Sequence, residues 1–175
     1  MIIGLLGPSC SGKSFLLKSL KELAEFFVPM SVTTRPQRKE ELWHLKHVSK
    51  RAFEKMEKQG ELCFVTDAFH GSYACLKFHQ ASSPDTALII TKGNIPELKS
   101  MGGIVVKIIP SDPQKAIEKI NLQNRGNKKE RIEALLLDLS NREDALADVV
   151  FENCYDEESL RDFLDLIQKL KQNNT

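Results

Sequence analysis

The sequence predicts an α/β protein in which helices cover both faces of a parallel sheet, giving three layers. Two observations lead to this prediction. Short apolar stretches of strand length alternate with longer stretches of helical periodicity, which is the pattern of a parallel sheet. A glycine-rich loop also separates the first strand from the first helix, at residues 7–14. A chain of 175 residues with 41% hydrophobic content can bury a sizeable core, and this length corresponds to about one domain.

The glycine-rich loop carries a phosphate-binding pattern, two glycines five residues apart followed by Lys and Ser. The glycines let backbone N–H groups turn inward as a nest for an anion, and Lys13 can reach β- and γ-phosphates. The hydroxyl of Ser14 is a candidate ligand for Mg²⁺. The loop therefore predicts a polyphosphate site. Its candidate residues are Gly7, Pro8, Ser9, Cys10, Ser11, Gly12, Lys13 and Ser14.

The flanks of the loop supply the context that the motif requires. Residues 1–6 form an apolar run of strand length, and apolar residues recur at helical spacing over residues 15–24. The loop is therefore expected between a buried strand and the N-terminus of a helix, where the helix favours an anion.

The rest of the chain continues the alternation. Apolar runs predict strands over residues 86–91, 103–109 and 149–151, and helical periodicity predicts helices over residues 113–123, 129–145 and 157–171. Asp112 offers a cap for the first of these helices, with Pro113 just inside its start. The segment of residues 29–83 is too long, and its sequence pattern too mixed, to be a single connection between the first helix and the next core strand. We therefore expect an inserted module there, and a core formed by residues 1–28 and 84–175.

The charge of the chain is nearly balanced, with a formal net charge of +1. This balance argues against a large surface for nucleic acid or for an anionic membrane. The distribution is uneven: residues 1–60 hold eleven Lys and Arg against six Asp and Glu, whereas residues 130–175 hold five against twelve. This asymmetry would draw an anionic ligand toward the phosphate loop, although ordinary solvated faces account for it equally well.

The four cysteines are scattered, without a Cys-x-x-Cys pair and without a secretory leader before them. We interpret them as reduced thiols and expect a cytoplasmic protein. The N-terminal apolar run is far shorter than the ~20 residues of a membrane span.

Several segments of the predicted insert and core resemble guanylate kinase. Residues 31–38 read Ser-Val-Thr-Thr-Arg-Pro-Gln-Arg, residues 47–53 read His-Val-Ser-Lys-Arg-Ala-Phe, and shorter matches follow at residues 59–61 and 70–73. Asn124-Arg125-Gly126 is similar to the lid sequence of that family, and Phe151-Glu152-Asn153 to its segment near the adenine. The resemblance spans roughly Ile2 to Leu170, and its most specific part is the Thr-Thr-Arg-Pro-x-Arg element together with the phosphate loop.

The resemblance implies a P-loop NTPase fold with an inserted module for a nucleoside monophosphate and a small lid at about residues 121–131. It implies transfer of the γ-phosphoryl group of ATP to that monophosphate, GMP in the typical family member, with Mg²⁺. Such transfer depends on positioning and on cations around both phosphates. By the match, Arg125 in the lid and Asn153 also contact ATP, and the acceptor phosphate is held by Ser31, Arg35 and Arg38.

The acceptor side departs from the family pattern. Leu45 and Ala74 stand where the family has phosphate-binding tyrosines, although a local shift could bring in Tyr73. The family Glu that accepts hydrogen bonds from guanine falls on Phe64 or Val65, depending on where an insertion is placed. A bulged strand could present Asp67 instead, or Asp67 could be an ordinary residue at the edge of a loop.

The core departs from the family pattern as well. Ile90 and Lys92 replace an Asp pair at the end of the next strand, and Asn121 and Leu135 replace two arginines. Arg131 lies one helical turn before Leu135 on the same face and could partly substitute. The candidate catalytic residues are Lys13, Arg35, Arg125 and Arg131.

Three functions remain open from the sequence. The first is a nucleoside monophosphate kinase with an altered choice of acceptor. The second is a catalytically weak or inactive guanylate-kinase-like domain that binds nucleotide or a protein partner. The third is a kinase for another small phosphorylated or hydroxyl-bearing acceptor, with Trp43, Phe64 and Phe69 lining an apolar pocket. The sequence does not indicate an oligomeric state.

Overall fold

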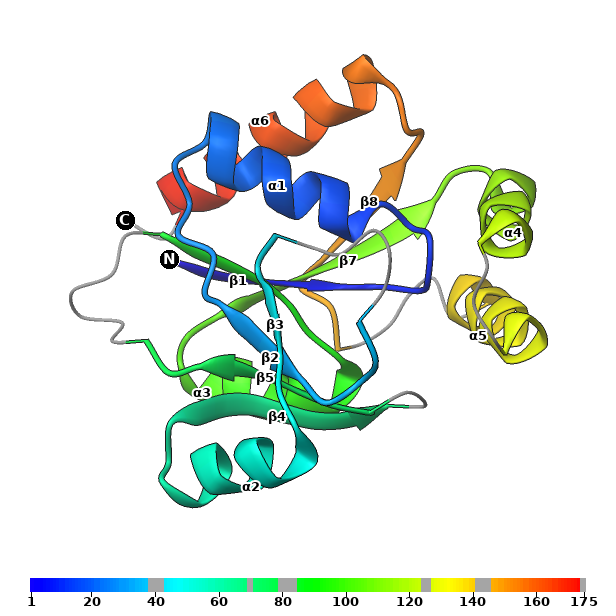
Figure 1. Ribbon diagram of the computed structural model, residues 1–175. Helices are drawn as coiled ribbons and strands as arrows, with labels where there is room; N and C mark the ends of the chain where they lie inside the picture. Colours follow the sequence, from blue (N-terminus) through cyan, green and yellow to red (C-terminus); the bar gives the residue numbers. More distant parts are fainter. Residues whose placement is uncertain (38–42, 69–70, 79–84, 124–126, 141–145, 174–175) are drawn as a thin grey trace.

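The computed structural model describes residues 1–37, 43–68, 71–78, 85–123, 127–140 and 146–173. Its centre is a four-stranded sheet of order β6-β1-β7-β8 in which every pair of neighbours is parallel (Figure 1). The strands are β1 (Ile2–Leu6), β6 (Thr86–Ile89), β7 (Ile104–Pro110) and β8 (Val149–Asn153). Parallel neighbours direct their carboxyl ends to one edge of the sheet, so the loops that follow β1 and β6 meet there.

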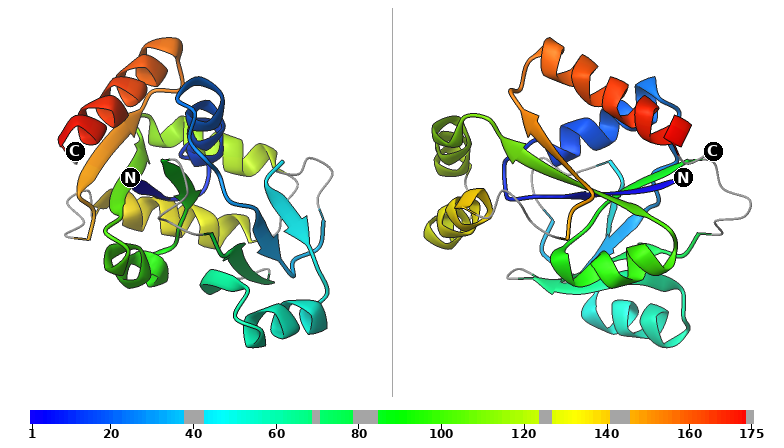
Figure 2. Two further views of the ribbon diagram at one scale, coloured as in Figure 1. Left: turned by 90° about the vertical axis from the view of Figure 1, so that its left-hand side faces the viewer. Right: turned by 180° about the vertical axis from the view of Figure 1, so that it is seen from behind.

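Helices cover both faces of this sheet, so the predicted three-layer α/β fold is confirmed. Helices α1 (Lys13–Leu23) and α6 (Glu157–Asn173) lie on one face, and α3 (Ile95–Ser100) lies on the other (Figures 1 and 2). The short helix η2 (Lys92–Asn94) connects β6 to α3. The predicted core strands and helices are all present, with ends that differ by a few residues.

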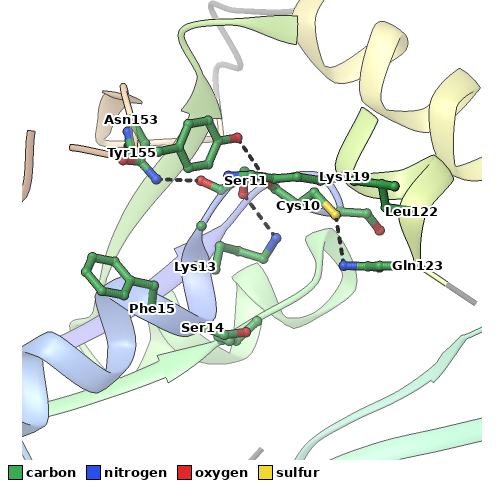
Figure 3. A pocket seen from close by; sticks show the side chains of 13 residues that line it. Cys10, Ser11, Lys13, Ser14, Phe15, Lys119, Leu122, Gln123, Asn153 and Tyr155 are labelled. Atoms are coloured by element: carbon green, nitrogen blue, oxygen red, sulfur yellow. Dashed lines mark hydrogen bonds between the residues drawn. The ribbon is translucent and has the colours of Figure 1, made fainter. Parts of the chain in front are cut away.

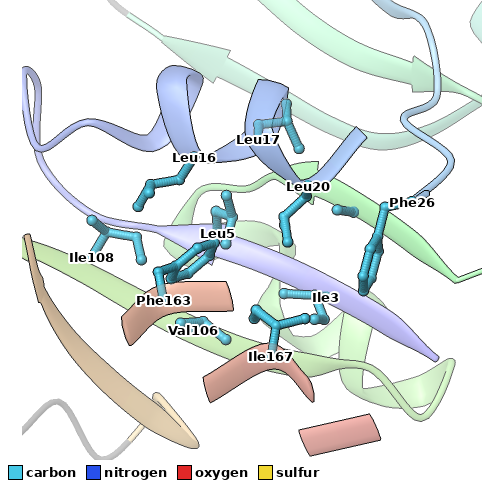
Figure 4. Close-up of a cluster of buried hydrophobic side chains, with 11 residues drawn as sticks. Ile3, Leu5, Leu16, Leu17, Leu20, Phe26, Val106, Ile108, Phe163 and Ile167 are labelled. Carbon is cyan, nitrogen blue, oxygen red and sulfur yellow. The ribbon is translucent and has the colours of Figure 1, made fainter. Parts of the chain in front are cut away.

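A continuous apolar cluster joins β1 and β7 to helices α1 and α6 (Figure 4). Its fully buried members include Ile3, Leu5, Leu16, Leu17, Leu20, Val106, Ile108 and Phe163. The spacing of Leu16, Leu17 and Leu20 places all three on one stripe of α1, which explains why this helix packs flat against the sheet. The cluster thereby fixes the end of β1 and the start of α1, between which the phosphate loop runs.

The predicted insert contains a second sheet of order β3-β2-β5-β4. Its strands are β2 (Ser31–Thr33), β3 (Leu45–His47), β4 (Leu62–Ala68) and β5 (Gly71–Leu76), and helix α2 (Lys50–Lys58) lies against them. Ser49 caps α2 by accepting a hydrogen bond from the backbone N–H of Ala52. Val32, Phe53, Leu62 and Ala74 form the small apolar core of this unit.

Helices α4 (Pro113–Leu122) and α5 (Lys128–Ser140) pack against each other beyond the carboxyl ends of β1 and β7. Asp112 caps α4 by accepting from the backbone N–H groups of Gln114 and Lys115. The contact between the helices buries Ala116, Ile120 and Leu135.

None of the four cysteines, all of which lie within the described residues, forms a disulfide. Within the described ranges, no helix combines the length and the apolar character needed to cross a membrane.

Candidate functional site

The phosphate loop requires glycine at two positions. Gly7 has φ +147°, and a Cβ there would lie 2.2 Å from the carbonyl oxygen of Ile108. Gly12, the residue before α1, has φ +95°, and a Cβ there would lie 2.1 Å from Nδ2 of Asn153. Any side chain would therefore collide with β7 or with the last residue of β8. The absence of side chains lets the backbone close into the cradle that a phosphate group fits.

Lys13 is folded over this loop. Its Nζ donates to the carbonyl oxygens of Gly7 and Pro8, at 2.6 Å each, and to Oγ of Ser11 at 3.3 Å. Burial lowers the pKa of Lys13 from its ordinary value to about 8, although Asp138 and Cys10 act to raise it. Figure 3 shows the lysine ending among the loop residues, where it contributes a cation to an anion-binding cradle.

The end of β8 and the residues that follow it hold the loop by hydrogen bonds (Figure 3). Asn153 donates from Nδ2 to the carbonyl oxygen of Ser11 at 2.9 Å, and its Oδ1 accepts from the backbone N–H of Tyr155 at 3.0 Å. The hydroxyl of Tyr155 donates to the carbonyl oxygen of Cys10 at 2.7 Å. Asn153 is buried, so its amide fixes the shape of the loop. Burial, with smaller contributions from Cys10 and Asp112, raises the pKa of Tyr155 to about 12.

A cleft of about 860 Å³ opens beside the phosphate loop. It is lined by Ser9 to Phe15 and by Ile89, Lys119, Leu122, Gln123, Asn153 and Tyr155. Phe15 and Leu122 expose 57% and 86% of their surface, and Nζ of Lys119 lies 3.5 Å from the ring centroid of Tyr155. Apolar side chains beside a phosphate loop suit the base and sugar of a nucleotide. Sequence reasoning missed Phe15, Lys119, Leu122 and Tyr155, because only the packing of α1, α4 and the segment after β8 brings them to the cleft.

Arg131 reaches the phosphate loop from helix α5. Its Nε lies 3.4 Å from Oγ of Ser9, and its Nη2 lies 2.8 Å from Oε1 of Gln123 and 3.8 Å from Sγ of Cys10. The predicted catalytic residues Lys13 and Arg131 are therefore brought to the same loop. Arg125, the other predicted catalytic arginine of this region, lies outside the described residues.

A second pocket of about 300 Å³ lies between the two sheets. It is lined by Ser31, Arg35, His44, Leu45, Phe64, Thr66, Tyr73, Ala74, Cys75, Ile89, Ile90, Thr91 and Asn94. Ile89, at the end of β6, lines both this pocket and the cleft at the phosphate loop, so the two cavities adjoin. The pocket brings together three of the predicted acceptor residues, Ser31, Arg35 and Tyr73. Arg38 lies outside the described residues.

Arg35 is the buried cation of this second pocket, with 4% of its surface exposed. Its Nη1 donates to the carbonyl oxygen of Pro36 at 2.9 Å, and its backbone N–H donates to Oγ1 of Thr33 at 3.2 Å. The carbonyl oxygen of Arg35 lies 3.0 Å from Nδ1 of His47. These contacts fix the backbone at Arg35 and one end of its guanidinium. A guanidinium is suited to a phosphate because its donors form a planar fork.

Strand β4 contains the bulge that Asp67 would need, but the bulge presents a different residue. The pairing of β4 with β5 shifts between Cys63 and Thr66, and Phe64 adopts φ +53°. Phe64 and Thr66 then face the pocket, whereas Val65 and Asp67 are exposed. Thr66, and not Asp67, therefore lines this pocket, because side chains alternate along the strand, and the acceptor role of Asp67 stays a prediction from the sequence.

The rest of the pocket wall is neutral. Phe64 donates its backbone N–H to Oε2 of Glu97 on α3 at 2.9 Å, which holds the bulge in place. Oγ1 of Thr91 donates to Oδ1 of Asn94 at 2.9 Å and lies 3.2 Å from Oγ1 of Thr66. None of the described residues that line the pocket carries a carboxylate. Thr66, Thr91 and Asn94 had no distinguishing pattern in the sequence, because only the meeting of β4 with η2 brings them together.

Lys92, one of the core residues that depart from the family pattern, forms an ion pair with helix α5. Nζ of Lys92 lies 3.3 Å from Oδ1 of Asp138 on α5, and the buried Lys107 donates to the carbonyl oxygen of Asp138 at 3.3 Å. Leu135 is fully buried between α4 and α5 and takes no part in the site. No group of three or more His, Cys, Asp or Glu side chains that could hold a metal occurs among the described residues.

Two solved structures resemble this chain over almost its full length. A guanylate kinase from Anaplasma phagocytophilum superposes with a TM-score of 0.71 at 19% identity, covering 97% of this chain and 85% of that chain. A shikimate kinase from Bacteroides thetaiotaomicron superposes with a TM-score of 0.52 at 15% identity, covering 98% of each chain. No protein-family model matches the sequence, and no curated protein does. At this level of identity the likeness establishes architecture, and the chain has a guanylate-kinase-like P-loop kinase fold.

Proposed function

We propose that this chain transfers the γ-phosphoryl group of ATP to the phosphate of a nucleoside monophosphate. The observation that carries the proposal is the pair of adjoining cavities that share Ile89. One holds a phosphate loop with its lysine, and the other holds a buried arginine. A donor phosphate and an acceptor phosphate bound there would meet near Ile89, which is the arrangement that in-line phosphoryl transfer needs.

On the donor side, the loop amides and Lys13 bind the β- and γ-phosphates of ATP, and Ser14 is the protein ligand of Mg²⁺. The loop fits ATP with Mg²⁺ because its two glycines let the backbone close around a phosphate at positions where a Cβ would collide. Mg²⁺ commonly takes one or two protein ligands and completes its shell with waters and substrate phosphates, so a single hydroxyl is compatible with it. The ion would neutralise charge between the β- and γ-phosphates.

On the acceptor side, Arg35 binds the monophosphate and Tyr73 adds a phenolic hydroxyl. Ser31, whose Oγ lies 3.6 Å from Sγ of Cys75, adds a second hydroxyl for the acceptor phosphate. From the family resemblance, Arg38 completes the acceptor site and Arg125 closes over the transferring phosphoryl group. Arg131 supplies a cation beside Ser9 and Cys10.

The acceptor base remains open between guanine and others. The Anaplasma protein is a guanylate kinase, which makes GMP the first acceptor to test. Guanine offers N–H donors, and the described lining of the pocket meets them with hydroxyls rather than a carboxylate. The similarity to a shikimate kinase places a hydroxyl-bearing acceptor without a base among the acceptors to test as well.

A second function is favoured by one observation, the neutral wall formed by Leu45, Phe64 and Ala74. A site that has lost several charged or hydroxyl donors would transfer slowly, since each such group commonly contributes on the order of 10²-fold or more. In that case the chain would bind nucleotide or a protein partner without efficient turnover.

The deciding experiment is a coupled assay of ADP release with ATP and Mg²⁺ against a panel of nucleoside monophosphates and shikimate. We expect at least one monophosphate to stimulate release. Lys13→Ala should reduce the stimulated rate by about 10²-fold or more, because it removes a cation from the transferring phosphates. Lys18→Ala is the matched control and should retain full activity, because Lys18 is an exposed lysine on the same helix, α1.

The outcomes separate the two functions. Binding of ATP without stimulation by any monophosphate would contradict the kinase and favour the binding domain. Stimulation by shikimate alone would retain the phosphoryl transfer and reject the nucleotide acceptor. Equal activity of Lys13→Ala and the wild type would reject the role of the phosphate loop.

A further inference from the structure

The guanidinium of Arg131 is oriented by a side chain that the family resemblance does not mark. Gln123, at the end of α4, accepts from Nη2 of Arg131 at 2.8 Å and donates from its Nε2 to Sγ of Cys10 at 3.4 Å. Figure 3 shows Gln123 reaching toward Cys10 from the side of α4. One amide therefore connects helix α4, the arginine of α5 and the tip of the phosphate loop.

One donor group of Arg131 has no hydrogen-bond acceptor. Its Nη1 is buried and makes no hydrogen bond, whereas Nε and Nη2 contact Ser9, Cys10 and Gln123. A buried N–H₂ group without an acceptor is rare and costly, so an acceptor that arrives with the ligand would be strongly bound. The cation lies beside the loop residues that precede Lys13, in the part of the cradle where phosphate charge gathers. The acceptor that fits is an anionic oxygen of a phosphate.

The position distinguishes one phosphate from the others. Lys13 is held at the start of the loop by the carbonyl oxygens of Gly7 and Pro8, and Arg131 approaches the next two residues, Ser9 and Cys10. Phe15, in the first turn of α1 at the other end of the loop, lines the same cleft on the side away from Cys10 and Gln123 and offers an apolar surface to the base and sugar (Figure 3). A nucleotide lying along the cleft would therefore present its last phosphate, rather than its first, to Arg131.

We propose that Gln123 is a positioning residue that holds Arg131 over the terminal phosphate of a nucleoside triphosphate, so that the pair selects triphosphate over diphosphate. This inference rests on the proposed function only in taking a nucleotide as the ligand of the phosphate loop. Phosphoryl transfer is not required for it. The amide acts through the arginine: it fixes the plane of the guanidinium and keeps Nη1 directed toward the incoming oxygen.

The test measures binding of ADP and of a non-hydrolysable imido analogue of ATP, each with Mg²⁺, by titration calorimetry. Gln123→Met keeps the length of the side chain and removes the amide. We expect it to weaken binding of the triphosphate analogue by about tenfold and to change binding of ADP less than twofold, since a charge-assisted hydrogen bond is lost at one phosphate only. Arg131→Ala should give the same selective loss.

A double variant separates positioning from general disturbance. If Gln123 acts through Arg131, adding Gln123→Met to Arg131→Ala should cause no further loss, because coupled residues are not additive. Gln114→Met, an exposed glutamine on the same helix, is the matched control and should bind both nucleotides as the wild type does.

Three results would overturn the proposal: equal weakening of both nucleotides by Gln123→Met, no weakening of either, or additive losses in the double variant. Binding reports on it whether or not any acceptor supports turnover. A wild-type protein that prefers the triphosphate but phosphorylates nothing would reject the proposed kinase and retain this inference. Where activity is found, Gln123→Met should lower kcat more than it raises KM for the acceptor.

Discussion

Gly12 in the phosphate loop is constrained both by its backbone angle and by a neighbouring side chain. Gly12 adopts φ +95° and abuts the amide of Asn153, which in turn binds the carbonyl oxygen of Ser11. The strain that a side chain would cause is therefore of two kinds, one from the backbone angle and one from the collision. Both act on the cradle itself.

Gly12→Ala should lower the free energy of unfolding by about 2 kcal/mol, since an unfavourable φ and a displaced buried amide each contribute. Urea denaturation of the variant checks this value. Gly93→Ala is the control, because the Cβ there would find only Oγ1 of Thr91, at 3.8 Å. Its stability should stay within about 0.5 kcal/mol of the wild type. An equal effect of both substitutions would show that the geometry of Gly12 is not restrictive.

Some residues of the candidate site could be predicted from the sequence, and others could not. The spacing of Gly7, Gly12 and Lys13 has a local physical cause, so the sequence alone indicated the phosphate loop. Thr66 lines the second pocket in place of Asp67 because a bulge set the alternation of β4, and that bulge depends on pairing with β5 and on Glu97 from α3. Such a contact between distant segments leaves no pattern in the local sequence.

At the scale of elements, helix α5 is seated by a narrow apolar contact. Leu135 is fully buried against Ala116 and Ile120 of α4, whereas Leu137 on the same helix exposes 63% of its surface. The family resemblance placed an arginine at position 135. Position 135 therefore serves packing in α5, and Arg131, one turn earlier, is the residue of this helix that contacts Ser9 and Cys10 of the phosphate loop.

Leu135→Ala should lower the free energy of unfolding by about 3 kcal/mol, because it removes buried methyl groups and leaves a cavity between the helices. Leu137→Ala has the same change in composition at an exposed position and should cost less than about 0.5 kcal/mol. Urea denaturation of both variants gives the comparison. If the two leucines prove equivalent, α5 is not anchored by this contact.

Elements of the core were predicted from periodicity, and those of the insert were not. The runs that became β6 and β7 are apolar because these strands are covered on both faces, so each is visible in isolation. Strands β2 and β3 span three residues each, and their pairing joins segments separated by residues 34–44. A strand that short is specified by its partners, which explains why the insert was expected as a module but its strands were not predicted.

At the scale of the whole molecule, one carboxylate ties the beginning of the chain to its last helix. Asp85 binds the N-terminal ammonium group of Met1 and Nζ of Lys171, each at 2.7 Å. Lys171 also lies over the ring of Phe26, with 4.5 Å between Nζ and the ring centroid. These contacts close the edge of the fold opposite the phosphate loop, where β1 and β6 begin and α6 ends.

The charge of Asp85 makes part of the stability depend on pH. Burial raises the pKa of Asp85, but the hydrogen bonds and charges of Lys171 and the N-terminal ammonium group outweigh it and hold that pKa below its ordinary value of 3.8. A carboxylate with a lowered folded-state pKa stabilises the fold above the unfolded-state pKa, and this contribution disappears as the pH falls through the folded-state pKa. Asp85→Asn should therefore lower Tm by about 2 °C between pH 5 and pH 7, the size expected for a partly exposed ion pair. The difference from the wild type should shrink steadily as the pH falls below 4. Asp162→Asn, an exposed site on α6, supplies the matched control, with no comparable difference at any pH. A Tm difference for Asp85→Asn that stays constant from pH 7 to pH 3 would assign the effect to packing and not to charge.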